Sequence, residues 1–220
     1  MENKLVLLKK SSRKLGRLLK KSLSKTITVE EKSAFDDLVT NIDKQTQDLL
    51  VARIKSAFPT DNILAEENNM VHNIKDGNVW VLDPIDGTVN FIVQQDNFCV
   101  MIAYYEKGQG KFGLIYNVMA DQLFYGGGQF DVYCNDKLLS PYKRRPLDRC
   151  LVGSNAAMYA KNYHGIKGFI DKTLGVRVYG GAGLSMSKVL SGQILAYFSV
   201  IYPWDYAAAS IMGKKIGLPT

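Results

Sequence analysis

The chain has 220 residues, of which 46% are hydrophobic and 22% charged, and its formal net charge is +7. These values are ordinary for a soluble globular protein, and the length allows one large domain or two tightly packed halves. No apolar run approaches about 18 residues and no apolar signal core follows the basic N-terminus, so we expect neither a transmembrane helix nor a secretory signal. The cysteines, Cys99, Cys134 and Cys150, are odd in number and form no CxxC pair, so we expect reduced thiols in a cytoplasmic protein.

The N-terminal segment carries most of the net charge. Residues 1–25, which include Lys25, hold nine Lys or Arg residues against one acid, so the segment has a charge of +8 and the rest of the chain −1. Leucines recur there at helical spacing, at Leu5, Leu8, Leu15 and Leu19, which predicts an amphipathic helix over 3–24. Such a helix can bind RNA or a membrane. Since no aromatic residue lies among its lysines, we favour a helix packed by its leucines.

The next elements alternate in a pattern typical of an α/β protein. Asp36-Asp37 precede a helix over 38–58, which Pro59 ends, and the apolar run 79–82 reads as a strand that enters a turn at Asp83-Pro84. An antiparallel meander is expected at 98–105, 112–118, 121–125 and 131–134. The remainder predicts a helix at 163–173, a strand at 175–179, a helix at 184–191, a strand at 194–200 and a helix at 204–215.

The most informative segment is Asp83-Pro-Ile-Asp-Gly-Thr88. Its two aspartates are three residues apart at the end of a strand, where Pro84 fixes φ and Gly87 permits a sharp turn. Both carboxylates and the Ile85 carbonyl can then converge on a hard cation such as Mg²⁺. A bare pair of aspartates at this spacing is more often a surface turn.

The chain resembles the inositol monophosphatase family, which belongs to the lithium-sensitive, Mg²⁺-dependent phosphatases. The segment Asp83–Thr88 matches the central motif of the family letter for letter. Glu66-Glu67 stands 17 residues earlier, where the family has its acidic pair, and Trp204-Asp205 stands where the family has its distal metal-binding aspartate. The string Leu38-Val-Thr-Asn-Ile-Asp43 is similar to the first-helix signature of the family.

The resemblance implies a role for each of these residues. Metal ligands would be Glu66, Asp83, the Ile85 carbonyl, Asp86 and Asp205, holding two or three Mg²⁺ ions per site. One ion would lower the pKa of a water molecule that acts as the nucleophile, and another would stabilise the leaving oxygen. Thr88 and Asp43 would orient and deprotonate the water, with Glu67 as a secondary contributor. The two histidines, His72 and His164, lie outside every motif and read as surface residues.

The resemblance also points to the substrate contacts. Gly87 and Thr88 would offer N–H groups to the phosphate, while Gly181 and Ala182, in a glycine-rich turn that opens a helix, would contact the substrate together with Asp205. Ser199 stands where inositol-selective members carry a glutamate, so we expect broad specificity for small phosphate monoesters. Inositol 1-phosphate, fructose 1,6-bisphosphate, 3′-phosphoadenosine 5′-phosphate and the 2′-phosphate of NADP(H) are substrates of relatives.

The expected fold is a layered αβαβα sandwich with an N-terminal helical pair, an antiparallel sheet and a second mixed sheet. Residues 1–145 would carry the helices, the antiparallel sheet and the metal motifs, and residues 146–220 a C-terminal α/β half, together forming one catalytic unit. Family members usually continue some tens of residues beyond the position of Thr220, so a terminal strand and helix are expected to be absent, through truncation or a shortened member.

We expect a cytoplasmic homodimer that acts on a small phosphorylated metabolite and binds no specific nucleic acid or membrane. The alternative is a non-catalytic RNA- or membrane-binding module, which should have lost a metal ligand, and none is missing.

Overall fold

A computed structural model of the chain describes residues 1–24, 27–32, 35 and 38–219. Lys25, Asp36, Asp37 and Thr220 lie outside the described residues, so the predicted acidic start of the second helix is not tested. The α-helices of the described part are α1 (Glu2–Ser22), α2 (Asn41–Ala57), α3 (Thr88–Val93), α4 (Ala156–Ala160), α5 (Ile166–Ile170), α6 (Ala182–Leu190) and α7 (Pro203–Lys215). Two short 3-10 helices span Leu147–Arg149 and Tyr163–Gly165.

Its strands form three sheets. They are β1 (Val29–Glu31), β2 (Leu38–Thr40), β3 (Asn62–Ala65), β4 (Asn78–Asp86), β5 (Cys99–Glu106), β6 (Gln109–Asn117), β7 (Gln122–Gly127), β8 (Phe130–Cys134), β9 (Lys137–Leu138), β10 (Val152–Ser154), β11 (Val176–Arg177) and β12 (Tyr197–Phe198). Strands β3 to β9 form one sheet in sequence order, β1 pairs with β2, and a small sheet has the order β11-β10-β12.

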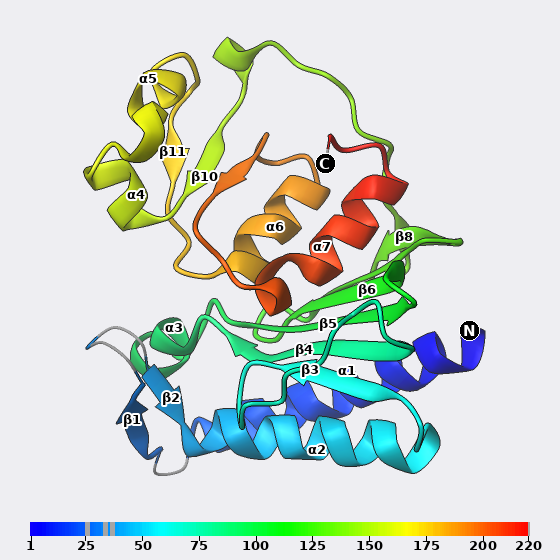
Figure 1. Ribbon diagram of the computed structural model, residues 1–220. Helices are drawn as coiled ribbons and strands as arrows, with labels where there is room; N and C mark the ends of the chain where they lie inside the picture. The colour runs from blue at the N-terminus through cyan, green and yellow to red at the C-terminus, as the bar shows by residue number, and fades with distance from the viewer. Residues whose placement is uncertain (25–26, 33–34, 36–37, 220) are drawn as a thin grey trace.

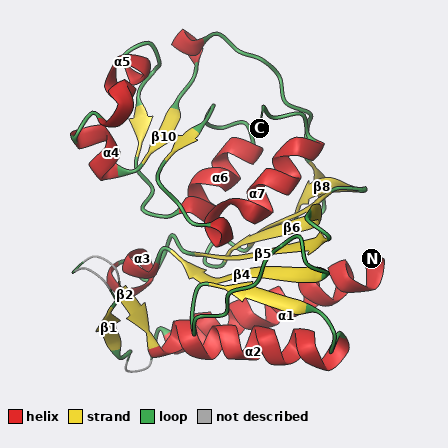
Figure 2. Ribbon diagram, in the orientation of Figure 1, coloured by secondary structure: helices red, strands yellow, loops and turns green. Residues whose placement is uncertain are grey.

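The elements stack in five layers, which confirms the expected αβαβα sandwich (Figures 1 and 2). Helices α1 and α2 cover one face of the seven-stranded sheet, and α6 and α7 cover the other. The small sheet and then α4 and α5 lie beyond α6 and α7. The large sheet is antiparallel except between β3 and β4. The sequence predicts a mixed second sheet, but both pairings described in it are parallel.

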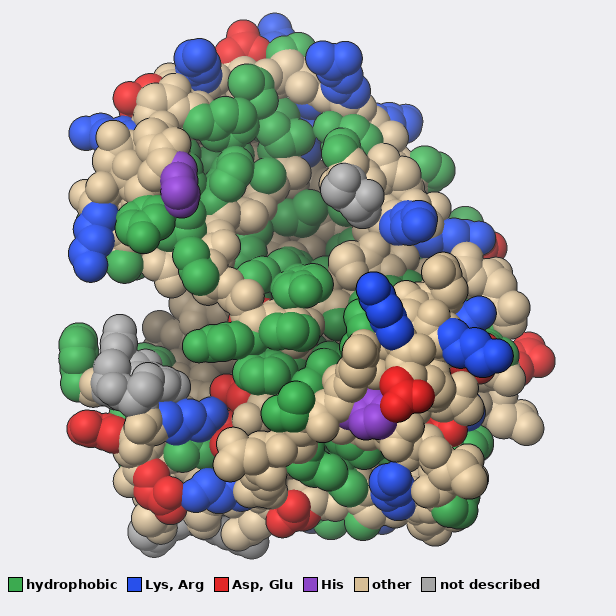
Figure 3. Space-filling model, viewed as in Figure 1, with side chains coloured by type: hydrophobic (Ala, Val, Ile, Leu, Met, Phe, Trp, Pro, Cys, Tyr) green, Lys and Arg blue, Asp and Glu red, His purple; other side chains and the backbone are tan. Residues whose placement is uncertain are grey.

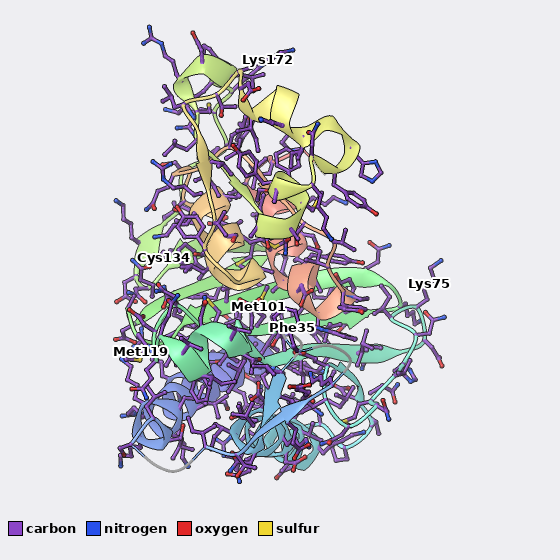
Figure 4. The ribbon with its side chains drawn as sticks, turned by 90° about the vertical axis from the view of Figure 1, so that its left-hand side faces the viewer. Phe35, Lys75, Met101, Met119, Cys134 and Lys172 are labelled. Atoms are coloured by element: carbon purple, nitrogen blue, oxygen red, sulfur yellow. The ribbon has the colours of Figure 1, made fainter. Side chains whose placement is uncertain are left out.

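Strand β4 is buried on both faces of the large sheet. Its alternating side chains Trp80 and Leu82 join the core beneath α1 and α2, whereas Val79 and Val81 join the core beneath α6 and α7. A strand covered on both sides favours apolar residues at successive positions, which explains the hydrophobic run 79–82. Figure 4 shows Met101 of β5 in the layer between the sheet and α6 and α7, where it is fully buried.

Helix α7 approaches the sheet closely because glycine lines its path. A Cβ atom added to Gly113 of β6 would lie only 2.3 Å from the carbonyl oxygen of Ala208. No side chain larger than hydrogen fits between the two backbones, since interiors are close-packed. This contact fixes the position of α7 and therefore of the aspartate in its first turn.

Several boundaries differ from the sequence prediction for physical reasons. The helix expected over 38–58 begins at Asn41, because Leu38–Thr40 pairs with β1 and Thr40 caps the helix through its hydroxyl. The strand expected at 79–82 continues to Asp86, since β5 pairs along it. The helix expected at 163–173 is broken by His164, whose φ of 52° is left-handed. The strands expected at 175–179 and 194–200 pair over only two residues each, because β10 between them has only three.

Helix α1 is packed by its leucines, as the favoured interpretation predicts. Leu5, Leu8, Leu15 and Leu19 are all buried in the core beneath the sheet. Near its start, the Lys4 ammonium pairs with Asp61 and donates a hydrogen bond of 2.6 Å to the Tyr104 hydroxyl. It lies 4.1 Å from the centre of the Tyr104 ring, and Asp61 also accepts a bond of 2.9 Å from the Trp80 indole. None of the described helices combines the length and the apolar character needed to cross a membrane.

We predict that Lys4→Met lowers the free energy of unfolding by about 2–4 kcal/mol, because it leaves the Asp61 carboxylate buried without its ammonium partner. Asp61 keeps two neutral donors, the Trp80 indole and the Asn78 amide, which limit the loss. Urea denaturation followed by circular dichroism measures the change. Lys10→Met, at an exposed position of the same helix, is the matched control and should change stability by less than about 0.5 kcal/mol. Equal stability of the two variants would contradict the prediction.

Candidate metal centre

An irregularity at the end of β4 brings Asp83 and Asp86 to one point. Residues three apart in a regular strand face opposite sides of the sheet. Here Asp83 pairs with Met101 and Asp86 with Cys99, and the register shifts between the two pairs. A bulge of this kind turns side chains toward a common side. Gly87, with a φ of 86°, then ends the strand and opens α3.

Asp205 completes an acidic triad from the other half of the chain. One carboxylate oxygen of each of Asp83, Asp86 and Asp205 lies within 4.8 Å of the other two. Asp205 is in the first turn of α7, where its carboxylate accepts a hydrogen bond of 2.7 Å from the Tyr202 N–H. The sequence prediction that these three residues come together is therefore matched by the geometry.

Backbone N–H groups at the start of α6 hold Asp86 in place. The N–H groups of Ala182 and Gly183 each donate a hydrogen bond of 2.8 Å, one to each carboxylate oxygen. Gly181 lies against the same carboxylate, since a Cβ added there would be 2.7 Å from Oδ2. In this structure the Ala182 N–H that the sequence assigns to substrate contact is thus bonded to a metal-ligand candidate.

The acidic pair Glu66-Glu67 lies beside the triad and forms salt bridges with a lysine side chain. Lys32, just after β1, places its ammonium 2.9 Å from Glu66 and also bonds to Glu67. The Gln47 side chain of α2 clamps the Glu67 backbone through its amide, with bonds of 2.6 Å and 2.9 Å. Sequence reasoning missed both Lys32 and Gln47, because neither belongs to a motif and their contacts bridge 20 or more residues.

Thr88 and Asp43 form a second polar group at the edge of the triad. The Thr88 hydroxyl lies 3.1 Å from both Asp43 Oδ1 and the Ile85 carbonyl oxygen, and it has one hydrogen to donate. The other oxygen of Asp43 accepts from the N–H and the hydroxyl of Thr40. Asp43 therefore has a fixed orientation, and Thr88 lies between it and the carbonyl predicted to bind a metal.

Burial and mutual repulsion raise the pKa values of the acidic residues. Burial, followed by the negative charges of Glu66, Asp86 and Asp205, raises the pKa of Asp83 well above its usual value. Burial raises the pKa of Asp86 to about 7, although the hydrogen bond from the Gly183 N–H acts to lower it. Burial also raises the pKa of Asp205, to about 6. Burial likewise raises the pKa of Asp43 and of Glu67. Such shifts are typical of functional carboxylates.

The residues present fit a hard metal ion. Asp83 Oδ1 is buried and has no hydrogen-bond partner among the described residues. A buried, unpaired carboxylate oxygen is costly unless a cation satisfies it. The three residues of the triad offer carboxylate oxygens, which suit Mg²⁺. The acidic triad can therefore hold a metal ion, as the sequence predicts.

The remaining residues singled out in the sequence are Ser199, the two histidines and the cysteines. Ser199 follows β12, and its hydroxyl donates to the Val200 carbonyl oxygen at 3.5 Å. His72 lies half-buried with its ring 3.1 Å from the Asp76 carbonyl, and His164 is exposed. The three cysteines are free, as predicted, although Cys134 is only half-buried.

Comparison with known proteins is consistent with this geometry. A family model described as the inositol monophosphatase family matches residues 2–217. The inositol-1-monophosphatase of Bacillus subtilis (strain 168) is 37% identical over 216 residues, which are 95% of this chain and 81% of the relative. A Thermotoga maritima protein named fructose-1,6-bisphosphatase/inositol-1-monophosphatase is 32% identical, over 93% of this chain and 79% of the relative.

Two further matches carry different names. A crystal structure of an inositol monophosphatase/NADP phosphatase complexed with Mg²⁺ and phosphate superimposes with a TM-score of 0.84 at 27% identity, covering 93% of this chain and 77% of that one. The Nus factor SuhB of Escherichia coli (strain K12) is 29% identical over 94% of this chain and 80% of the relative.

We predict that the metal-free protein loses stability as the pH rises from about 4 to about 7. An acid whose pKa is raised by folding keeps its proton in the folded state, so its contribution is lost as the pH rises through the folded pKa, about 6 for Asp205 and about 7 for Asp86. Thermal denaturation in chelator measures the effect, with about 2–4 °C lost for each 1 kcal/mol. Excess Mg²⁺ should remove the loss, because it binds the ionised carboxylates. A melting temperature that rises with pH in chelator would contradict this prediction.

Proposed function

The chain belongs to the inositol monophosphatase family and is a phosphatase, and from this premise we propose that it hydrolyses small phosphate monoesters with Mg²⁺. The family acts on small phosphorylated substrates. The observation that carries the proposal is the convergence of Asp83, Asp86 and Asp205, together with the buried, unpaired oxygen of Asp83. Such an arrangement is unstable alone and becomes favourable once cations bind.

The ligands would be Glu66, Asp83, the Ile85 carbonyl, Asp86 and Asp205, for two or three Mg²⁺ ions. Bound Mg²⁺ would stabilise the charge on the phosphate oxygens and lower the pKa of water. Lys32 compensates the charges of Glu66 and Glu67 in the metal-free protein. A metal ion that binds Glu66 would compete with this ammonium. Lys32 would therefore neutralise the acidic pair until a metal ion displaces it from Glu66.

Thr88 and Asp43 would activate the attacking water. When the Thr88 hydroxyl donates its hydrogen to Asp43 Oδ1, its oxygen lone pairs accept a hydrogen of the water. The raised pKa of Asp43 suits it to take up a proton during the reaction. Glu67, whose backbone Gln47 holds and whose carboxylate is repelled by the charge of Asp43, would be a secondary contributor. The attacking oxygen forms a bond to phosphorus while the bond from phosphorus to the alcohol oxygen breaks. The departing oxygen takes up a proton from solvent water and Asp43 returns its proton to solvent, so inorganic phosphate and the alcohol are released.

The substrate would lie between the two halves of the chain. The N–H groups of Gly87 and Thr88 at the start of α3 would bind the phosphate, and Gly181, Ala182 and Asp205 would border the alcohol group. Since β4 comes from residues 1–145 and α7 from residues 146–220, we propose that the two halves form one catalytic unit.

Specificity is proposed to be broad because Ser199 replaces a carboxylate. A neutral hydroxyl contributes roughly 0.5–1.5 kcal/mol to a hydrogen bond, whereas a charged acceptor contributes roughly 1.5–3 kcal/mol. Inositol 1-phosphate would then be hydrolysed within about tenfold of fructose 1,6-bisphosphate or the 2′-phosphate of NADP, a difference of about 1.4 kcal/mol. The names of the relatives, which include both of the other activities, support this breadth.

The alternative reading, a non-catalytic RNA- or membrane-binding module, has less support. The name Nus factor belongs to a relative of 29% identity, and in this chain the leucine face of α1 is buried in the core. Retention of every metal ligand favours the enzyme. A cytoplasmic homodimer inhibited by lithium is proposed from the family alone.

We predict that phosphate release from inositol 1-phosphate requires Mg²⁺ and stops in chelator. Chelation removes the charge that stabilises the phosphate oxygens, and no protein cation other than Lys32 is described beside the acidic pair. A colorimetric phosphate assay, with metal content verified by elemental analysis, measures the loss, and added Mg²⁺ should restore activity. Full turnover by verified metal-free protein would exclude the proposed function.

We predict that Asp86→Asn lowers turnover on the order of 10²-fold or more in a protein that remains folded. The amide removes one anionic ligand, and its NH₂ group cannot accept the hydrogen bond from the start of α6. The circular dichroism spectrum should be preserved, because loss of a charge also relieves repulsion in the triad. Asp136→Asn, at an exposed hairpin position, should retain full activity. Near-normal turnover of Asp86→Asn would remove this residue from the metal site.

A further inference from the structure

A cleft apart from the metal centre lies between the end of α6, the β8–β9 hairpin and the segment 139–145. Its volume is about 480 Å³, and its described lining contains no acidic residue but four cations, which are Lys137, Lys143, Arg145 and Lys188. Residues 26–220 have a net charge of only −1, so four cations around one cleft are a local concentration of positive charge. Figure 3 shows Lys and Arg side chains on the right-hand side of the molecule, over the region where α7 ends and β8 lies in Figure 1.

The four cations have no acidic partner among the described residues. Elsewhere in this part of the chain, lysines such as Lys4 and Lys32 pair with carboxylates, but none of the four forms a salt bridge there. Lys188 is half-buried in the last turn of α6. Burial raises the pKa of the Cys134 thiol in the cleft wall, and the charges of Lys137 and Lys188 both act to lower it. The positive charges of the hairpin and of α6 therefore act on the same point of the cleft.

Arg145 has a fixed position at the end of α6. Its guanidinium donates a hydrogen bond of 2.8 Å to the carbonyl oxygen of Gly192, which follows the helix. The Tyr142 N–H donates a hydrogen bond of 2.7 Å to the Ile216 carbonyl oxygen, which holds the segment 139–145 against the end of α7. The bond to Gly192 uses one of the five N–H groups of a guanidinium, and the others can face a ligand.

These features match a small ligand with several negative charges. The volume of the cleft lies within the range of small-molecule sites, roughly 300–1,000 Å³. Guanidinium groups bind phosphate oxygens through paired hydrogen bonds, and lysine ammonium groups add point charges. The negative end of the α6 dipole opposes an anion, so a single negative charge would gain little. A diphosphate group, in contrast, can contact several cations at once.

We propose that this cleft is a second ligand site, which binds small anions that carry a diphosphate group. None of the residues predicted for metal, catalysis or substrate lines it. Helix α6 connects it to the metal centre, because α6 begins at the amides that hold Asp86 and ends with Lys188 and Leu190 in the cleft wall. The nine residues of α6 place its two ends about 12 Å apart. Binding in the cleft would not require the phosphatase activity.

Calorimetric titration of inorganic pyrophosphate into the metal-free protein, in buffer without chelator, tests the site. Metal ions are left out because Mg²⁺ binds pyrophosphate and would draw it to the acidic triad, which repels anions when it holds no cation. We expect saturable binding of one pyrophosphate per chain. The double variant Arg145→Met and Lys188→Met should raise Kd about tenfold or more, since charge-assisted hydrogen bonds are lost.

The matched control is the double variant Lys10→Met and Lys14→Met, which removes two charges from exposed positions of α1. It should change Kd by less than about twofold. A second cleft pair, Lys137→Met and Lys143→Met, lies at exposed positions of the rim and should raise Kd about threefold or more. Circular dichroism checks that each variant is folded, and the exposed rim pair tests the site even where the half-buried Lys188 does not tolerate replacement.

Absence of saturable binding to the unmodified protein would overturn the proposal. Unchanged affinity in the folded cleft variants would also overturn it. So would equal weakening by the α1 control and the cleft variants, because general charge attraction rather than the cleft would then hold the anion.

Discussion

Repulsion between buried carboxylates is the constraint on which the architecture of the site depends. Two unit charges 4.8 Å apart repel by roughly 3–4 kcal/mol at an effective dielectric constant of about 20, and the triad contains three such groups. The fold offsets this repulsion with positively charged and partly positive groups at fixed positions. The amides at the start of α6 hold Asp86, the Tyr202 N–H holds Asp205, and the Lys32 ammonium pairs with Glu66. Asp83 Oδ1 is a buried oxygen without a hydrogen-bond partner among the described residues, and this oxygen marks where a cation is needed.

Rigid elements keep the carboxylates from moving apart. Asp83 and Asp86 belong to a strand buried on both faces, and the pairing of β4 with β5 fixes the bulge between them. Asp205 belongs to a helix whose distance from the sheet is set by the contact of Gly113 with Ala208. The packing of the two apolar cores thereby holds the carboxylates close together despite their mutual repulsion. Such locally unfavourable arrangements are common at functional sites.

The sequence predicts the layers of the fold and the candidate metal ligands because both depend on patterns within short segments of the chain. The leucine spacing of α1, the apolar run of β4 and the motif Asp83–Thr88 are each readable within about fifteen residues. What the sequence does not reveal depends on contacts between distant segments. Lys32 meets Glu66 across the chain, Gln47 clamps Glu67, and the Ala182 amide binds Asp86 rather than remaining open. The continuation of β4 through Asp86 likewise depends on its partner β5, and the short strands β11 and β12 depend on the length of β10.

The bonds from α6 to Asp86 have a thermodynamic consequence. The same carboxylate is both a metal-ligand candidate and the anchor of the glycine-rich turn, which Asn90 also holds through a hydrogen bond to the Tyr179 carbonyl. Any ligand whose affinity depends on the position of that turn must therefore be energetically coupled to cation binding. Such coupling is reciprocal, so a cation that tightens the binding of the ligand by some factor is itself bound tighter by the same factor. Occupancy of the two kinds of ligand would then be coupled through Asp86, in addition to any direct contact between them.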